Sequence, residues 1–255
     1  MTYCVGLLLN EGLVMLSDSR TNAGVDYIST YSKLTVWETP GERAVGLSTA
    51  GNLSISQNVV TMLDEGLPDA SGKLVSMNTV ESMTEAARLV GRAIREVERL
   101  EGPNMRQAGV GFDVSFILGG QINGRQLRMF LFYTAGNYIE ASTESPFFQI
   151  GELKYGKPIL DRIVDFSTSL EDATKCALIS MDSTIRSNIS VGLPLDLMIF
   201  RRNAARIETL RSIPADDAYF KSISDGWSNG LREAFEKIPS PQWAEPSSPV
   251  ATLVS

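Results

Sequence analysis

The order of apolar patterns along the chain most constrains its fold. Short apolar runs bounded by turn residues predict strands over roughly the first 50 residues, and helical spacing of apolar residues follows them. The same blocks then recur, giving strands, two helices, strands, two helices and strands. Helices that are segregated between blocks of strands favour an α+β fold over a wound parallel sheet. We therefore expect two antiparallel sheets stacked face to face, with helix pairs covering both outer sides.

Two hairpins are predicted near the N-terminus. Asn10-Glu11-Gly12 forms the first turn, and Thr39-Pro40-Gly41-Glu42 forms the second, where Pro-Gly in a short polar linker is a strong turn signal. We expect the four strands to form one antiparallel sheet, with the first two helices on one of its faces. These strands cover residues 3–9, 13–17, 33–38 and 44–48.

The remaining elements follow from the same signals. The second predicted helix has a plausible N-terminal cap at Asn78-Thr79, and Asn123-Gly124 is a strong hairpin turn. Helices are expected over residues 53–66, 78–100, 153–165, 171–186 and 215–236, and strands over residues 114–118, 127–133, 138–141, 147–150, 195–201 and 205–210. No linker divides the chain, so we expect one domain over residues 1–255, with an extended C-terminal tail over residues 239–255.

The absence of histidine restricts the chemistry more than any other feature of the composition. Without His, a Ser-His-Asp or Cys-His triad is excluded, and so are the imidazole ligands of a catalytic zinc ion. A general base must then be a carboxylate, a Lys, a Tyr or the terminal amine of the chain. The two cysteines, Cys4 and Cys176, form no CxxC pair, so we expect packed, inert thiols in a reducing compartment.

The charge and hydropathy of the chain limit its partners. The formal net charge is -7 and there is no long basic tract, so neither nucleic acid nor an anionic membrane surface is expected as a partner. Glu11 interrupts the apolar residues near the N-terminus, and no basic segment precedes them, unlike in a signal peptide. No apolar run has the length of a membrane span, and we expect a cytoplasmic protein.

Thr2 is the candidate nucleophile. Methionine aminopeptidases remove Met before small residues, so the mature chain would begin with Thr2. An N-terminal Thr carries a hydroxyl and an α-amine on adjacent carbons, and the amine, with a reference pKa of about 7.7–8.0, can act as general base. This chemistry needs no histidine. Many chains have Thr at position 2, so the interpretation depends on residues elsewhere.

Three further residues are predicted to meet Thr2. Asp18 ends the second strand, where a hairpin returns it beside the start of the first. Lys33 begins the next strand, and its positive charge, held by Asp18, would lower the pKa of the Thr2 hydroxyl and amine. Gly51 ends the fourth strand before a helix, where backbone N–H groups can approach an oxyanion. Together these residues predict a site for acyl transfer.

These segments resemble the proteasome β-subunit family of N-terminal nucleophile hydrolases, and most closely its bacterial branch of ancestral β-subunits. The spacing from Thr2 to Asp18 matches the family, whereas Lys33 lies one residue nearer than in ordinary β-subunits. The motifs that carry the resemblance are Thr2-Tyr3-Cys4-Val5-Gly6, Ser17-Asp18-Ser19-Arg20-Thr21-Asn22-Ala23-Gly24-Val25, Ile28-Ser29-Thr30 up to Lys33, and Ala50-Gly51.

The resemblance implies a four-layer αββα sandwich and threonine-type peptidase chemistry on peptides or unfolded proteins. Thr2 would attack the peptide carbonyl to form an acyl-enzyme ester, with its α-amine as the base. Asp18 and Lys33 would form the electrostatic pair, Arg20 would support the site, and the Gly51 N–H would stabilise the oxyanion. No metal or organic cofactor is required. The family also implies a large homo-oligomer, either a ring or a helix, and an ATPase partner that the sequence does not identify.

Two departures from the family pattern lie further along the chain. Ser190 matches the serine of the family's Asp-x-x-Ser-Gly motif, but Ser187 stands where the Asp is expected. The usual assisting serine is also missing from the segment Gln149-Ile150-Gly151-Glu152. These departures leave two alternatives open. One is a non-catalytic or weakly active assembly protein, and the other is an N-terminal nucleophile amidohydrolase that acts on a small amide.

Overall fold

Two five-stranded antiparallel sheets form the centre of the computed structural model, which describes residues 2–22, 28–204 and 206–243. We call them the β1 sheet and the β6 sheet. The β1 sheet has the order β12 (Phe147–Gly151), β1 (Tyr3–Leu8), β2 (Gly12–Asp18), β13 (Leu195–Arg201) and β14 (Thr209–Ile213). The β6 sheet has the order β11 (Tyr138–Glu140), β10 (Arg128–Phe132), β9 (Val114–Ile122), β6 (Arg43–Gly51) and β5 (Leu34–Thr39).

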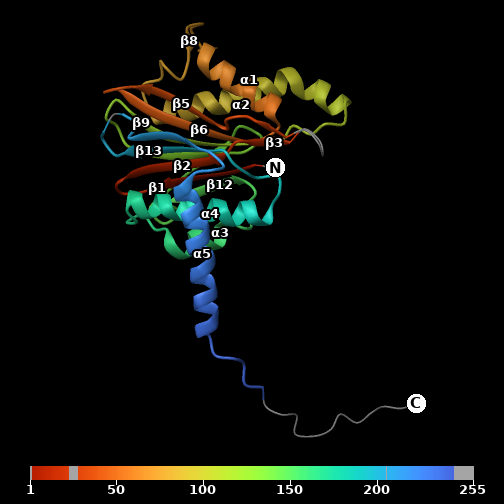
Figure 1. Cartoon of the computed structure of the whole chain (residues 1–255). Coiled ribbons are helices and arrows are strands. Elements are labelled where there is room, and N and C mark those ends of the chain that lie inside the picture. Colours follow the sequence, from red (N-terminus) through yellow and green to blue (C-terminus); the bar gives the residue numbers. More distant parts are fainter. Residues whose placement is uncertain (1, 23–27, 205, 244–255) are drawn as a thin grey trace, which may run out of the picture.

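The two sheets face each other, and helices cover their outer sides (Figure 1). Helices α1 (Leu53–Glu65) and α2 (Met83–Gln107) lie on the β6 sheet, whereas α3 (Lys157–Ile163) and α4 (Leu170–Ser187) lie on the β1 sheet. Helix α5 (Ala218–Lys237) extends away from these layers. The expected α+β class is therefore confirmed.

Three apolar cores hold the layers together. Ile55, Val90 and Phe116 belong to the core between α1, α2 and the β6 sheet, and a second core lies between α3, α4 and the β1 sheet. The third core lies between the two sheets and includes Met15 and Met198. Gly46 permits this close approach, since a Cβ there would lie 2.8 Å from the Met15 sulfur and 2.9 Å from the Met198 sulfur.

The expectation that the first four strands form one sheet is wrong. The hairpin of β1 and β2 belongs to one sheet and the hairpin of β5 and β6 to the other. Every residue of β1 and β2 is buried, because one face packs on helices and the other on the facing sheet. Strands buried on both faces have continuous apolar sequences, which do not reveal the sheet to which a hairpin belongs. The first helix pair accordingly covers the β6 sheet rather than the sheet that contains β1.

Several element boundaries also differ from the predictions. Helix α2 starts after Ser82, whose hydroxyl accepts a hydrogen bond from the Glu85 N–H, and it continues through Pro103. Helix α3 starts at Lys157, and strand β14 starts at Thr209, while residue 205 lies outside the described residues. Two short hairpins were not predicted, namely β3 (Arg20–Asn22) with β4 (Ile28–Thr30) and β7 (Leu67–Pro68) with β8 (Leu74–Val75).

Most of the predicted C-terminal tail and part of one family motif lie outside the described residues. Of the predicted tail, residues 239–243 follow α5 without regular structure, and residues 244–255 lie outside the described residues, as do Met1 and the family motif residues Ala23-Gly24-Val25. Within the described part of the chain, no helix combines the length and the apolar composition needed to cross a membrane.

Candidate active site

A cavity of about 470 Å³ opens where β6 ends and where the N-terminal segment meets the end of β12. Of the residues predicted for the site, Thr2, Arg20, Lys33 and Gly51 line this cavity, and Ser190 does not. Asp18 lies fully buried behind it, in contact with Lys33. The complete lining is Thr2, Arg20, Thr21, Lys33, Thr49, Ala50, Gly51, Leu53, Ser56, Asp113, Ser115 and Gly151.

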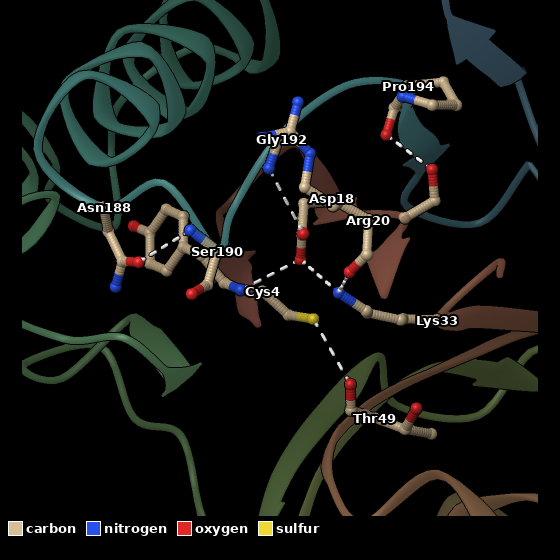
Figure 2. A network of polar contacts seen from close by, with 11 residues as sticks. Cys4, Asp18, Arg20, Lys33, Thr49, Asn188, Ser190, Gly192 and Pro194 are labelled. Atoms are coloured by element: carbon tan, nitrogen blue, oxygen red, sulfur yellow. Dashed lines mark hydrogen bonds and ion pairs between the residues drawn. The ribbon is translucent and has the colours of Figure 1, made fainter. Parts of the chain in front are cut away.

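The Asp18 carboxylate accepts hydrogen bonds from three donors, as Figure 2 shows in part. Its Oδ1 accepts hydrogen bonds from the Tyr3 N–H at 3.0 Å and from Lys33 Nζ at 2.8 Å, and its Oδ2 accepts one from the Gly192 N–H at 3.4 Å. The hairpin brings this about, because Cys4 pairs with Ser17 and so the next pair along the ladder is Tyr3 and Asp18. Burial raises the pKa of Asp18, and the Lys33 ammonium opposes that rise.

Lys33 is held in place by contacts from separate parts of the chain. Its Nζ donates to Asp18 Oδ1 and, at 2.6 Å, to the Arg20 carbonyl, while its own carbonyl accepts from the Thr49 N–H at 2.9 Å. An ammonium has three N–H donors, so one donor remains for the cavity that Lys33 lines. The side chain is only 6% exposed, and its positive charge therefore acts in a poorly solvated environment.

Thr2 is positioned by the end of β12. The Glu152 N–H donates to the Thr2 carbonyl at 2.7 Å, and Thr2 itself is only 8% exposed. Gly151 has φ of +83°, and a Cβ at this position would lie 2.0 Å from the Thr2 carbonyl oxygen. The backbone of Thr2 thus approaches β12 so closely that only glycine fits at position 151.

Gly51 has a comparable constraint on the other side of the cavity. Its φ is +107°, and a Cβ would lie 2.4 Å from the Asp113 carbonyl oxygen. The next residue, Asn52, caps α1 by accepting a hydrogen bond from the Ser54 N–H at 3.0 Å. The N-terminal end of α1 therefore lies directly beyond Gly51, where its backbone dipoles favour a developing negative charge.

Arg20 and Ser190 take part in the loop that follows α4. Arg20 Nη1 donates to the Ile189 carbonyl at 3.0 Å, and its guanidinium lies against Gly192, where a Cβ would come within 2.3 Å of Arg20 Cζ. The Ser190 N–H donates to Asn188 Oδ1 at 3.0 Å (Figure 2). This loop delivers the Gly192 N–H to Asp18, so Arg20 and Ser190 contribute to the support of the carboxylate.

The cysteines are free and buried, as expected. Cys4 lies beside the site, where its Sγ donates to the Thr49 carbonyl at 3.6 Å, and burial raises its pKa. Burial likewise raises the pKa of Cys176 to about 11. Both groups are therefore thiols at neutral pH, and a thiol is a much weaker nucleophile than a thiolate.

Sequence reasoning missed two polar residues that connect Thr2 to the loop after α4. In the sequence, Glu152 stands out only as part of a segment that lacks a serine, and Asn188 only as a member of the segment around Ser190. In the structure Asn188 Nδ2 donates to Glu152 Oε2 at 3.0 Å, and both residues are buried. A buried glutamate and a buried asparagine 36 positions apart give no local sequence signal of their contact.

Together, facing antiparallel sheets and an N-terminal segment at a polar cavity define a proteasome-like protein, in agreement with comparisons with solved structures. Anbu (ancestral beta-subunit) from Yersinia bercovieri is 46% identical over 94% of this chain and 100% of that chain, with a TM-score of 0.86. A Gly-1 mutant of Anbu from Hyphomicrobium sp. strain MC1 is 45% identical over 95% and 100% of the two chains, with a TM-score of 0.87.

A third structure, described as a helical assembly of the Anbu complex from Pseudomonas aeruginosa, is 45% identical, covers 94% of this chain and 98% of that chain, and has a TM-score of 0.87. The chain therefore belongs to the Anbu family of proteasome-like ancestral β-subunits, which confirms the resemblance seen in its motifs. No family model and no curated protein matches the sequence.

Proposed function

We propose that this chain is a proteasome-type threonine peptidase that hydrolyses peptide bonds through an acyl-enzyme ester on Thr2 after Met1 has been removed. The observation that carries the proposal is the shared cavity of Thr2, Lys33 and Gly51, with the buried Asp18 bound to Lys33 behind it. The absence of histidine supports it further, because the α-amine of Thr2 then supplies the base.

The proposed reaction begins when Thr2 Oγ attacks the substrate carbonyl carbon and its proton passes to the α-amine. Lys33, oriented by Asp18, supplies positive charge next to the developing alkoxide, and the Gly51 N–H stabilises the oxyanion. The protonated amine then gives its proton to the leaving nitrogen as the peptide bond breaks. Water attacks the ester with the amine again as base, which releases the acid product and regenerates Thr2.

We also propose that the layers described above are the four-layer αββα sandwich of N-terminal nucleophile hydrolases, and that residues 1–255 form a single domain in a cytoplasmic protein. The three cores support this proposal, since one lies between the sheets and one lies under each helix pair.

Arg20 and Ser190 act in the proposed reaction as supporting residues, because they hold the loop whose Gly192 N–H bonds to Asp18.

Intact-mass spectrometry tests the proposed chemistry directly. The purified chain is expected to lack Met1 and to gain one adduct from a peptide epoxyketone, whose two electrophilic carbons can bond both the hydroxyl and the α-amine of an N-terminal Thr. Fragmentation should locate the adduct at Thr2. The variant Thr61→Ala, which alters an exposed threonine of α1, is the matched control and should be labelled like the wild type. A chain that retains Met1 and takes up no reagent contradicts the proposal.

Homo-oligomeric assembly is the second part of the proposal. Helix α5 buries Phe220 and partly buries Ile223 and Trp227 against the rest of the chain, but it leaves other large apolar side chains in solvent. Leu231, Phe235 and Ile238 are 52%, 77% and 68% exposed and recur at helical spacing on one side of the helix end. An exposed apolar patch of this kind is typical of an interface, and the relative from P. aeruginosa forms a helical assembly.

Light scattering tests this assembly. We expect a mass several times the 27.8 kDa of one chain, and a smaller mass for Phe235→Asp, which places a charge in the apolar patch. Asn229→Asp adds the same charge on the opposite side of α5 and should leave the mass unchanged. A wild-type monomer or dimer would count against assembly and favour a small-amide amidohydrolase, which needs no large oligomer.

A non-catalytic or weakly active assembly protein is the second candidate function. Ser187, at the position of the family's aspartate, is exposed, and Ser190 does not line the cavity, so neither residue touches the space around Thr2. The labelling experiment separates the two functions, because an assembly protein without catalysis needs neither a free α-amine nor a reactive hydroxyl.

A further inference from the structure

A buried polar bridge joins the segment that follows β12 to the end of α4. Glu152 directly follows β12, and Asn188 directly follows α4 as its C-terminal cap. Asn188 Nδ2 donates to Glu152 Oε2 at 3.0 Å, and each residue is 8% exposed. A polar pair that is buried to this degree is costly to break, because each group would lose its partner without regaining full hydration.

The bridge connects to the nucleophile at one end. The Glu152 backbone N–H donates to the Thr2 carbonyl at 2.7 Å, so the residue that supplies the carboxylate also holds the Thr2 backbone. Gly151, whose missing Cβ allows Thr2 to approach to contact distance, directly precedes it. A shift of Glu152 would therefore move Thr2 within the cavity.

At its other end the bridge connects to Asp18. Asn188 Oδ1 accepts from the Ser190 N–H at 3.0 Å, which shapes the turn that leads to Gly192 (Figure 2). The Gly192 N–H then donates to Asp18 Oδ2 at 3.4 Å. Hydrogen bonds, together with the backbone from Ser190 to Gly192, thus connect the Thr2 carbonyl through Glu152 and Asn188 to the carboxylate that orients Lys33.

The charge of Glu152 orients the amide of Asn188. The Lys154 N–H, at 3.0 Å from Glu152 Oε1, and the Asn188 amide both favour the carboxylate form and lower the pKa of Glu152. A carboxylate only accepts hydrogen bonds, so it selects the NH₂ side of the Asn188 amide. The amide oxygen is then directed to the Ser190 N–H, which only donates.

We propose that Glu152 and Asn188 are positioning residues for the peptidase reaction, and that their charge-matched bridge keeps Thr2 aligned with Asp18 and Lys33. The inference rests on the proposed function, because it concerns the reactivity of Thr2. Neither side chain lines the cavity, so the pair acts through the Thr2 backbone and through the loop that binds Asp18. A displacement of about 1 Å in such a network can lower a rate by about 10²-fold.

The test changes the charge of the bridge and follows the rate of Thr2 labelling by a peptide epoxyketone. Asn188→Asp places two carboxylates in contact, and we expect labelling at pH 8 to fall about 10- to 100-fold relative to the wild type. Two adjacent carboxylates can share a proton at lower pH, so the ratio of variant to wild-type rate should rise as the pH falls to 5.5. A defect that does not depend on the added charge would leave this ratio flat.

The double variant E152Q/N188D supplies the decisive comparison. Its new amide donates to its new carboxylate, which still accepts from the Ser190 N–H, so labelling should return to within about threefold of the wild type. Asn104→Asp, an exposed position on α2, controls for the added charge and should label like the wild type at every pH. If N188D alone fails to fold, recovery of folding and labelling in the double variant supports the bridge.

Three results would overturn the inference, and the last is distinguishable from the first two. If the wild type is labelled and N188D reacts at the wild-type rate across the pH range, the bridge has no positioning role while the proposed peptidase chemistry stands. A folded double variant that labels at less than about a tenth of the wild-type rate has the same meaning. If the wild type is not labelled, the proposed function fails first, and the positioning role fails with it.

Discussion

Replacement of Thr2 by Ala is expected to reduce peptide hydrolysis by at least about 10⁴-fold, whereas Thr2→Ser should retain measurable activity. Ala lacks the nucleophilic oxygen but preserves the α-amine, the cavity and the contact of the residue-2 carbonyl with the Glu152 N–H. Met is removed before Ala and Ser as it is before Thr, so all three chains should begin at residue 2. The comparison therefore isolates the hydroxyl.

The measurement is the rate of release of a fluorescent group from short peptides, together with intact mass to verify that Met1 is absent from each variant. Equal thermal stability of the three proteins serves as the control for folding. Hydrolysis by Thr2→Ala at the wild-type rate would mean that another residue attacks the substrate, and the proposed mechanism would then be wrong.

Replacement of Lys33 by Met is expected to destabilise the fold by about 3–5 kcal/mol at pH 8 and to remove Thr2 reactivity. Asp18 is fully buried, and Lys33 is its ion-pair partner at 2.8 Å. Without Lys33, the donors that remain to the carboxylate among the described residues are the N–H groups of Tyr3 and Gly192. Removal of both charges in D18N/K33M should restore most of the stability but no reactivity, because a neutral pair lacks the positive field next to Thr2.

The loss of stability in Lys33→Met should increase as the pH rises. Burial already raises the pKa of Asp18, and loss of the ammonium that opposes this rise would raise it further. The folded state then keeps the Asp18 proton to a higher pH than the unfolded chain, whose Asp titrates near pH 4. The variant should therefore be closest to the wild type at acidic pH and lose stability as the pH rises through the folded pKa.

Urea unfolding at pH 5 and pH 8, at one protein concentration, measures this difference. Lys73→Met, which removes an exposed ammonium, is the matched control and should change stability by less than about 0.5 kcal/mol at both pH values. Two results would argue that Asp18 is not an uncompensated buried charge in Lys33→Met. One is an equal loss of unfolding free energy at the two pH values, and the other is a double variant D18N/K33M that is no more stable than Lys33→Met.

The sequence predicts the order of elements and the contact of residue 18 with the start of β1, because both depend on local information. The turn at Asn10-Glu11-Gly12 sets the register of the β1–β2 hairpin, and the register alone brings Asp18 opposite Tyr3. The expected contribution of Gly51 likewise depends on a strand end that precedes a helix. These inferences need no knowledge of the neighbouring sheet.

The remaining features depend on contacts between distant segments. The assignment of two hairpins to two sheets is not visible in strands that are buried on both faces, such as β1 and β2. The place of Ser190 depends on how the loop after α4 meets Asp18 and Arg20, and the Glu152–Asn188 bridge depends on the approach of β12 to the end of α4. In these segments the sequence shows which residues are polar but not which residues they contact. It therefore predicts that the family's serine and aspartate are missing there, but not that Glu152 and Asn188 contact each other.

The hydrogen bond from the Tyr3 N–H to Asp18 has a consequence for the newly made chain. It links the residue after the nucleophile to a carboxylate 15 positions away, and the same contact extends the ladder between β1 and β2. In the proposed mechanism a polypeptide leaving the ribosome would therefore carry an ordinary, unreactive threonine at its tip. Peptidase activity would appear only after β1 and β2 had paired along their whole length, so incompletely folded chains would not cleave other proteins.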